Sequence, residues 1–419
     1  MELTKSDLKK SFYGLVPTDW ITCQFQEVLT GFSSGMTPYR AIPEYYKGNI
    51  PWITSGELNY NVITDTIEKI TQEAVVKTNL KILPKGTFLM AITGLEAAGT
   101  RGSCAITGVE ATTNQSCMAL FPKEGKIETN YLYHFYVMYG NDLAFKFCQG
   151  SKQQSYTGRI VKILPINLPP TLKEQKAIAT ALSDVDDLIA SLEDLIAKKQ
   201  AIKQGAMQQL LIPKEHWVKT CLVELAENKK SRFDDGDWIE SEHIISQGVR
   251  LIQTGNIGIG SFLDKGNKKY ISEESFNQLN CKEVLTGDLL VCRLAEPAGR
   301  ACIMPNIGEQ KVITSVDVSI FRGNESLVSR EFLSQIFTTK SWFNKVLEKV
   351  GGTTHKRISR GALGKIEIEL PQKKEQDKTA KILSDMDGEL EQLETKKAKY
   401  QQLKQGMLQE LLTGNTRLV

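Results

Sequence analysis

Two long segments of the chain place apolar residues at steps of three, four or seven positions, between residues that are mostly charged. This spacing predicts amphipathic helices from about Leu172 to Leu211 and from about Lys373 to Leu412. Each would be about 60 Å long at 1.5 Å per residue, with a narrow apolar stripe suited to one partner helix. We therefore predict that the two helices pack on each other; one core helix in each domain is the less favoured alternative.

The two helical segments are copies of each other. They align without a gap at an offset of 201 residues, and 18 of 38 positions are identical. Both begin with Glu-Gln, at Glu174 and Glu375, and both contain the sequence Lys-Gln-Gly near their ends. A repeat of this length indicates two similar halves in tandem. A pseudo-twofold axis between such halves would bring the matching helices together antiparallel.

The segments that precede the helices consist of short apolar runs separated by glycine and proline, a pattern typical of strands and turns. They match more loosely; Trp52 to Leu58, for example, parallels Leu251 to Ile257. Short helices are expected from Asn130 to Tyr139 and from Ser329 to Thr338. The fold class is therefore α+β, with two tandem mixed α/β domains, each followed by a long helix. The predicted boundaries are 1–167 and 213–371 for the domains, and 168–212 and 372–419 for the helices.

Motifs for catalysis and for metal binding are missing from the sequence. There is no glycine-rich phosphate loop, no H-E-x-x-H and no G-x-S-x-G, and the eight cysteines form no C-x-x-C pair. The run from Asn167 to Pro170 only faintly echoes a methyltransferase motif, and a strand ended by proline explains it better. Asp184 with Asp186, and Asp385 with Asp387, point to different faces of a helix, so we interpret them as solvated or partner-facing groups.

Localisation and cofactors follow from the same absences. No stretch is apolar enough to span a membrane, and the first residues do not resemble a secretory signal. We expect reduced cysteines, no metal and no cofactor in this chain, and a cytoplasmic protein that does not contact a membrane.

The helical repeats, their Lys-Gln-Gly segments and the order domain–helix–domain–helix resemble the specificity subunit of type I restriction-modification enzymes. This resemblance implies that the two domains are target recognition domains for double-stranded DNA. It implies an antiparallel coiled coil that spaces the domains and docks two methyltransferase subunits, to which restriction subunits are added. S-adenosylmethionine would then be bound by the methyltransferase subunits, and this chain would have no catalytic activity.

Charge alone does not favour DNA binding. Residues 1–167 have 16 Lys and Arg against 14 Asp and Glu, and residues 213–371 have 22 against 21. DNA-binding domains usually have a basic excess. The resemblance accounts for the difference if partner subunits supply much of the phosphate contact, which leaves base reading to a few residues in each domain.

Polar loops that contain glycine are the candidates for base reading, because Lys and Arg donate to guanine and Gln pairs with adenine. In the first domain the candidate residues are Ser34, Thr37, Tyr39, Arg40, Thr93, Arg101, Lys152, Gln153 and Gln154. In the second domain they are Lys229, Lys230, Arg232, Arg293, Arg300, Thr354, His355, Lys356 and Arg357. The alternative for any one of them is an ordinary solvated loop residue.

A second function stays open at this point. The chain could be a coiled-coil scaffold whose two domains bind proteins. The polar, glycine-bearing loops favour the DNA reader.

Overall fold

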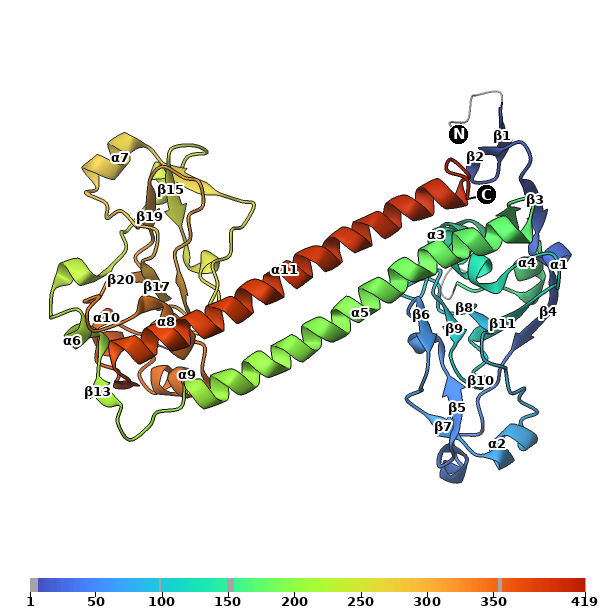
Figure 1. Cartoon of the computed structure of the whole chain (residues 1–419), viewed down its shortest axis with the longest axis horizontal. Helices are drawn as coiled ribbons and strands as arrows, with labels where there is room; N and C mark the ends of the chain where they lie inside the picture. Colours follow the sequence, from blue (N-terminus) through green and yellow to red (C-terminus); the bar gives the residue numbers. More distant parts are fainter. Residues whose placement is uncertain (1–6, 98, 149–153, 353–355, 419) are drawn as a thin grey trace. The chain divides into compact units, whose positions relative to one another are not determined.

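The computed structural model describes residues 7–97, 99–148, 154–352 and 356–418 (Figure 1). The chain divides by its internal contacts into two units; unit 1 is Met1–Asp194 with Thr395–Val419, and unit 2 is Leu195–Glu394. The two long helices are α5, Leu172–Leu210, and α11, Lys373–Leu412, within one residue of the predicted bounds. Each unit contains one α+β domain, the first part of one long helix and the last part of the other.

Unit 1 is built on two sheets. The larger has the strand order β4-β11-β8-β9-β6, and the smaller has the order β10-β5-β7. Two further strand pairs, β1 with β2 and β3 with β12, complete it. The strands are β1 (Leu8–Ser11), β2 (Gly14–Pro17), β3 (Ile21–Gln24), β4 (Leu29–Ser34), β5 (Ile50–Ile53), β6 (Asn61–Ile63), β7 (Lys69–Ile70), β8 (Phe88–Ala91), β9 (Cys104–Thr107), β10 (Thr112–Thr113), β11 (Cys117–Pro122) and β12 (Pro165–Leu168).

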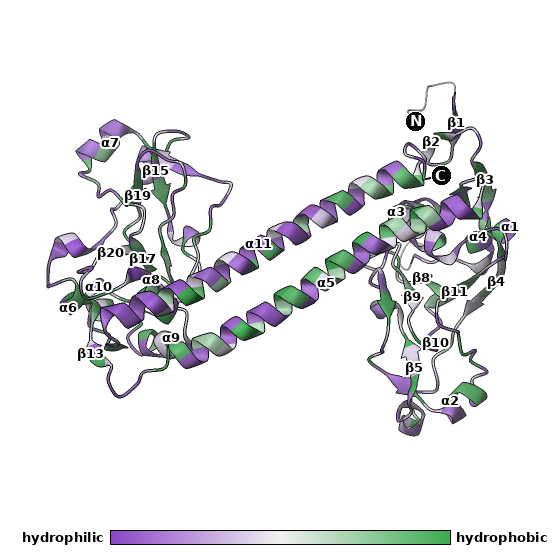
Figure 2. Cartoon of the chain, in the orientation of Figure 1, coloured by the Kyte–Doolittle hydropathy of each residue, from purple (hydrophilic) through white to green (hydrophobic). Residues whose placement is uncertain are grey.

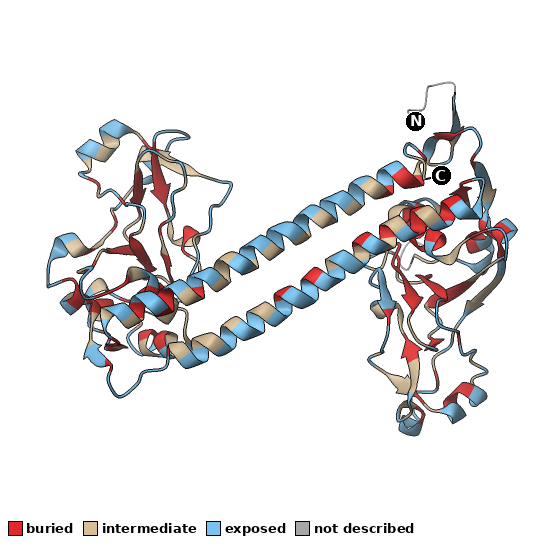
Figure 3. Ribbon diagram, in the orientation of Figure 1, coloured by how far each residue is buried: buried red, intermediate tan, exposed pale blue. Residues whose placement is uncertain are grey.

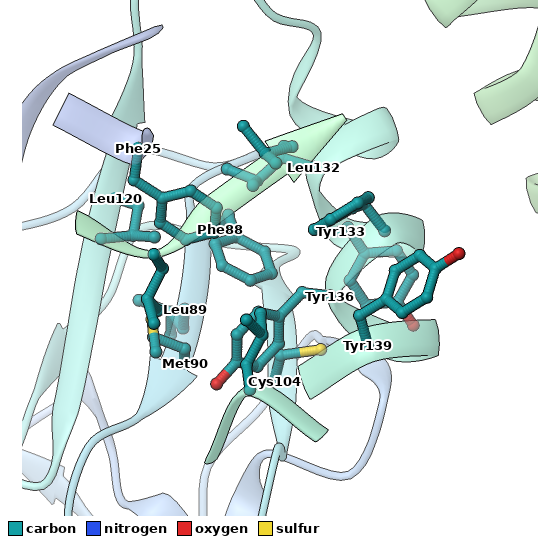
Figure 4. Packing of buried hydrophobic residues seen from close by; sticks show 14 of the residues in the cluster. Phe25, Phe88, Leu89, Met90, Cys104, Leu120, Leu132, Tyr133, Tyr136 and Tyr139 are labelled. Carbon is teal, nitrogen blue, oxygen red and sulfur yellow. The ribbon is translucent and has the colours of Figure 1, made fainter. Parts of the chain in front are cut away.

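The core of unit 1 lies between the larger sheet and helix α3, Thr129–Phe147 (Figure 4). Tyr136 of this helix meets Phe88 of β8 edge to face, with ring centroids 5.7 Å apart. Strands β8 and β9 of this sheet are buried along their whole length (Figure 3). The other helices of unit 1 are α1 (Phe25–Val28), α2 (Gln72–Lys77) and α4 (Gly158–Ile163), with 3₁₀ turns η2 (Pro43–Tyr46) and η3 (Ser55–Glu57).

Unit 2 repeats this plan. Its larger sheet has the order β14-β20-β17-β18, its smaller sheet β16-β15-β19, and β13 pairs with β21. The strands are β13 (Val218–Thr220), β14 (Phe233–Asp235), β15 (Val249–Ile252), β16 (Lys269–Ile271), β17 (Leu289–Cys292), β18 (Ala301–Ile303), β19 (Val312–Thr314), β20 (Val318–Phe321) and β21 (Ile368–Leu370). The helices are α6 (Leu222–Leu225), α7 (Glu273–Gln278), α8 (Arg330–Ile336), α9 (Lys340–Leu347) and α10 (Arg360–Gly364), with 3₁₀ turns η4 (Lys230–Arg232), η5 (Ser241–His243) and η6 (Thr254–Asn256).

Strand pairing shows that the two units share one topology. In unit 1, β5 pairs parallel with β10 and antiparallel with β7. In unit 2, β15 pairs parallel with β19 and antiparallel with β16. The predicted tandem of two mixed α/β domains with long helices is therefore confirmed.

The short helices differ from their predicted bounds. The first continues to Phe147, because Leu143 and Ala144 extend its buried face. The second ends at Ile336, and a new helix, α9, begins after Thr339, whose side chain accepts a hydrogen bond from the Trp342 amide. A threonine in this capping position explains the break.

The Glu-Gln pair at the start of each long helix attaches that helix to its domain. The buried Gln175 side chain accepts from the amide of Glu128, the N-cap of α3, at 3.0 Å. Gln376 does the same at 2.9 Å for Ser329, the N-cap of α8. The repeated glutamines thus satisfy a backbone donor at the N-cap of each of these two helices.

One ion pair joins the long helices within unit 1, and a second cation, Arg417, binds two carboxylates just beyond the end of α11. Lys404 Nζ lies 2.5 Å from Asp186 Oδ1, and Arg417, which follows α11, contacts Glu174 at 2.5 Å and Asp19 at 3.1 Å. From Glu174 to Asp186 the contacts advance along α5, while their partners move back from Arg417 to Lys404. This is the order that antiparallel packing produces. Asp186 is therefore a helix–helix contact.

Unit 2 has the matching contacts. Lys203 pairs with Asp387, and Lys199 lies 2.7 Å from Glu389. His216 Nε2 lies 3.0 Å from the Glu375 carboxylate. This hydrogen bond is the largest cause of the lowered pKa of Glu375. The offset of 201 residues relates Lys203 and Asp387 to Lys404 and Asp186, so the same pair of contacts occurs once in each unit. Along both helices, apolar and polar residues alternate (Figure 2).

A neutral polar side chain stands beside each of these aspartates. In unit 1 it is His134, whose Nε2 lies 3.0 Å from Ser183 Oγ and whose Nδ1 lies 4.0 Å from Asp186. Burial first, and then Lys404, lower the pKa of His134 to about 3, so the ring is neutral at physiological pH. In unit 2 the matching residue is Gln335, which donates to Asp387 at 3.3 Å.

Replacing Gln376 by alanine should destabilise the chain. The variant leaves the Ser329 amide and the carbonyls of Leu327 and Pro371, 3.1 and 2.9 Å from Gln376 Nε2, without this partner. We expect the free energy of unfolding to fall by about 3 kcal/mol, measured by chemical denaturation. The control is Gln372→Ala on an exposed side chain, expected within about 0.5 kcal/mol of the wild type. Equal effects of the two changes would contradict this role.

Candidate nucleic-acid interface

Three strand ends meet at one end of the larger sheet of unit 1. β4 ends at Ser34, opposite Met118, and β8 ends at Ala91, opposite Cys117, where β11 begins. The loops that follow β4 and β8 therefore start side by side, although about 57 residues separate them in sequence. Both loops contain predicted base-reading residues.

A third loop joins them. Gln154 and Ser155 lie beside the loop that follows β8, because the Leu95 amide donates to the Gln154 carbonyl at 3.1 Å and Thr93 bridges Ser155. The Gln154 amide also donates to the Glu96 carboxylate at 3.0 Å. The structure thus gathers all three predicted loops of the first domain. Lys152 and Gln153 lie outside the described residues.

The loop after β4 is fixed by its backbone. Met36 donates its amide to the Thr113 carbonyl at 3.1 Å, and a Cβ on Gly35 would lie 1.8 Å from that carbonyl oxygen. Glycine is required here by close approach. The loop presents Tyr39, which is 69% exposed, while Thr37 donates to Gln115 at 2.5 Å.

Arg40 is held at the edge of this loop. Its two terminal nitrogens lie 2.5 and 2.8 Å from the carboxylate oxygens of Glu68, and its guanidinium lies over the Tyr46 ring at 4.2 Å. Such a bidentate, stacked arginine has a fixed orientation. Its side chain is still more than half exposed.

Unit 2 brings its own loops together in the same way. β14 ends at Asp235 and β17 at Cys292, and both ends flank the start of β20 at Val318. The Ala295 amide donates to the Lys356 carbonyl at 3.0 Å, and Leu294 bridges Arg357. The loops that contain Arg293–Arg300 and Lys356–Arg357 are therefore adjacent. Thr354 and His355 lie outside the described residues.

Arg293 does not have the exposure that base reading requires. Its side chain is 3% exposed, its Nε lies 2.9 Å from Asp235 Oδ1, and it donates to the carbonyls of Val316 at 2.5 Å and Ile358 at 3.2 Å. It thus joins the end of β14 to the two loops that contain Val316 and Ile358. The sequence predicted that Arg293 donates hydrogen bonds to DNA. In the structure its guanidinium is buried and binds other parts of the protein instead.

Two other arginines that were predicted to read bases donate instead to backbone carbonyls of the protein. Arg300 donates to the carbonyls of four residues, at 2.8 to 3.0 Å. Arg101 donates to the carbonyls of Leu95 and Glu96, both at 2.9 Å. These arginines shape the loops after β17 and β8, and their donors are largely occupied.

The segment from Lys229 to Arg232 lies at the opposite end of the sheet from the other predicted loops of the second domain. It precedes β14, whose first residue, Phe233, pairs with Phe321 at the end of β20. Lys229 and Arg232 both pair with Glu227, at 2.8 and 2.6 Å, while Lys230 lies 3.8 Å from Asp234. Composition selected this lysine-rich loop, whereas the repeat offset points to a different position in the second domain.

The true counterpart of the Ser34–Arg40 loop follows β14. Gly236 has no room for a Cβ, which would lie 2.4 Å from the Ser315 carbonyl, and Asp237 donates its amide to the Thr314 carbonyl at 2.9 Å. These residues match Gly35 and Met36 at the offset of 201. That offset was the available signal, and it leads to Trp238, which the sequence prediction missed.

Among the described residues, exposed donors therefore remain at Lys356 and Arg357 in unit 2. Arg357 is paired with Asp317 at 2.7 Å but keeps 43% of its side chain exposed. In unit 1 the corresponding end offers Ser34, Tyr39, Arg40 and the half-exposed Gln154. The two ends share a backbone plan and differ in nearly every side chain.

Within the described residues, no group of three or more His, Cys, Asp or Glu side chains is arranged to hold a metal ion. None of the described helices is both long and apolar enough to cross a membrane. The cysteines are free thiols, five of them buried, and burial raises the pKa of Cys302 to about 12. Asn167 is buried and bonded to Thr22 and Ser11, at 2.8 and 3.1 Å, as a structural residue.

A family model for the type I restriction modification DNA specificity domain matches residues 17–204 and again residues 215–405. The chain belongs to this family. It is a type I specificity subunit with two target recognition domains.

Relatives agree with this assignment. The MjaVIII specificity subunit of Methanocaldococcus jannaschii is 24% identical over 443 aligned residues, covering 100% of this chain and 98% of that protein. The MjaIX specificity subunit of the same organism is 32% identical over 188 residues, or 44% of this chain and 42% of that protein.

Solved structures share the fold of this specificity subunit. The S subunit of a type I restriction-modification system from M. genitalium has a TM-score of 0.62 at 15% identity, covering 94% of this chain and 96% of that one. A chain from a study of complex assembly and conformational transition of the type I system has a TM-score of 0.51 at 16% identity, covering 96% and 99%.

Replacing Arg293 by methionine should destabilise the second recognition domain. The change removes a buried guanidinium from Asp235 and from two carbonyls. We expect a loss of about 3 kcal/mol in unfolding free energy, measured by chemical denaturation. Lys356→Met, on an exposed neighbouring loop, is the matched control and should change it by less than about 0.5 kcal/mol. If Arg293→Met were as stable as the control, Arg293 would not be a cross-link.

Proposed function

We propose that this specificity subunit reads a two-part, asymmetric DNA site, with one recognition domain for each half. The observation that carries the proposal is that each unit gathers loops distant in sequence at one end of its larger sheet. A common backbone plan there presents different side chains, for instance Gln154 in one domain and Lys356 in the other. Two unlike surfaces of this kind suit two different half-sites, with bases between them that are not read.

The proposed readers are side chains of the gathered loops that are at least partly exposed: Ser34, Thr37, Tyr39, Arg40, Thr93 and Gln154 in the first domain, and Lys356 and Arg357 in the second. Arg40 is the best oriented of these, because Glu68 and Tyr46 fix its plane. An arginine whose orientation is set before binding loses little entropy when it meets a base edge. Lys152, Gln153, Thr354 and His355 belong to the same loops by sequence and stay in the proposal.

Catalysis is assigned to partner subunits. We propose that two methyltransferase subunits, which bind S-adenosylmethionine, dock on the long helices, and that restriction subunits complete the nuclease. The repeated helix supports two docking surfaces, because the same ion pair occurs in each unit, at Asp186 with Lys404 and at Asp387 with Lys203. We propose further that the paired helices form one antiparallel coiled coil.

A protein scaffold is the competing function. In a scaffold, the loop ends would bind proteins, and substitutions there would change which proteins are bound without changing any DNA sequence preference. The family assignment and the exposed hydrogen-bond donors favour the DNA reader.

Substitutions in the loops should separate the two half-sites. Lys356→Ala or Arg357→Ala should relax one half-site by roughly 1–3 kcal/mol, and Lys152→Ala or Gln154→Ala should relax only the other. Sequencing of methylated sites in the assembled enzyme measures both. Lys219→Ala, an exposed lysine on β13, is the control and should change neither. Relaxation of one and the same half-site by both sets would contradict the assignment.

The two-surface argument predicts two methyltransferase subunits for each chain. Native mass spectrometry with excess methyltransferase should show this ratio. Leu393→Asp should reduce assembly, because it places a charge on the half-buried apolar stripe of α11. The control, Gln392→Asp, adds the same charge at the adjacent exposed position and should leave the ratio unchanged. A ratio of one methyltransferase to one chain would refute the two surfaces.

A further inference from the structure

One of the five tryptophans differs sharply from the rest. Trp20, Trp52, Trp217 and Trp342 are between 0% and 8% exposed, whereas Trp238 is 68% exposed. Trp238 lies in the loop after β14, at the end of the sheet where the loops of the second domain meet. Tryptophan is enriched at binding interfaces, because its ring contributes a large contact area together with one hydrogen-bond donor.

The exposure of Trp238 is imposed by the fold. On one side, the Gly236 amide donates to the Val318 carbonyl and the Asp237 amide to the Thr314 carbonyl, both at 2.9 Å. On the other side, Ile239 packs against the core of the smaller sheet. The backbone is therefore held immediately before and after Trp238 while its side chain is presented to solvent.

Three carboxylates precede Trp238 in the sequence and would repel DNA if they were unpaired. Each has a cation. Asp234 lies 3.2 Å and Asp237 3.4 Å from Lys282 Nζ, and Asp235 lies 2.9 Å from Arg293. The Lys282 amide also donates to Asp237 at 2.7 Å. Their charge is therefore largely compensated within the protein.

The surroundings of Trp238 are polar. Arg293 links the strand before it to the loop of Arg357, and Lys356 and Arg357 are the exposed donors there. An aromatic ring among hydrogen-bonding groups suits duplex DNA, whose grooves expose sugars, thymine methyl groups and base edges that donate and accept hydrogen bonds. The matching loop of the first domain exposes Tyr39, at 69%, in the same neighbourhood.

We infer that Trp238 contacts duplex DNA, with its ring against a base or sugar of the half-site that the second domain reads. This inference rests on the proposed function and adds a specificity-determining residue to it. The Gly236 close approach and the Lys282 pairings serve to position that ring.

The test uses the full chain assembled with its methyltransferase subunit, comparing wild type, Trp238→Phe and Trp238→Ala. Trp238→Ala should methylate cognate sites roughly five- to 150-fold more slowly, the range for loss of one specific base contact, and should relax one half-site only. Trp238→Phe keeps an aromatic face and should stay within about fivefold. The four buried tryptophans report folding of both variants, because their emission should be unchanged.

Three results would overturn the inference. Unchanged methylation by Trp238→Ala at a two-part site would show that Trp238 does not contact DNA, while the proposed function would stand. Fewer methyltransferase subunits on Trp238→Ala in native mass spectrometry would assign the ring to a protein partner. A wild-type complex that methylates no two-part site would overturn the proposed function and this inference together.

Discussion

The Asp–Lys contact between the long helices, which occurs once in each unit, is the constraint on which the rest of the structure depends. In each unit an aspartate of one helix meets a lysine of the other, and a neutral side chain of the neighbouring domain helix stands beside that aspartate. Pairing of a lysine with an aspartate at a half-buried position is favourable only when both are present, since either one alone would be left unpaired. The pair therefore specifies the register of the helices as well as adding stability.

Residues of the repeat attach each domain to the long helix that follows it. The two domains differ from each other at the end of the larger sheet that these residues do not contact. Gln175 and Gln376 satisfy the N-caps of α3 and α8, so the position of each sheet follows from the helix beside it. At the far end of the sheet the residues are free to diverge. The second domain uses buried Arg293 where the first has buried Ile92 at the matching position, and the loops around them present different donors.

The long helices were predictable because a strict apolar spacing and an internal repeat both defined them. The loops were only partly predictable. Their polar composition identified five of the six segments at the loop ends, but it could not distinguish an exposed donor from one that binds its own backbone, as with Arg293, Arg300 and Arg101. That distinction depends on contacts between residues far apart in the sequence. Trp238 was not among the predicted residues, because composition directed attention to the lysine-rich loop before β14. The repeat offset from Gly35 leads to Gly236 and so to the loop that contains Trp238.

The most direct test of the helical register is a charge exchange at Asp186 and Lys404. Chemical denaturation of Asp186→Lys, of Lys404→Asp and of the double variant gives their coupling energy. Each single change places like charges together and should cost about 2 kcal/mol, and the double variant should recover at least half of the summed loss. If the losses of the two single changes simply added in the double variant, Asp186 and Lys404 would not be in contact. That result would contradict the register of the helices and the equivalence of the Asp–Lys contacts in the two units.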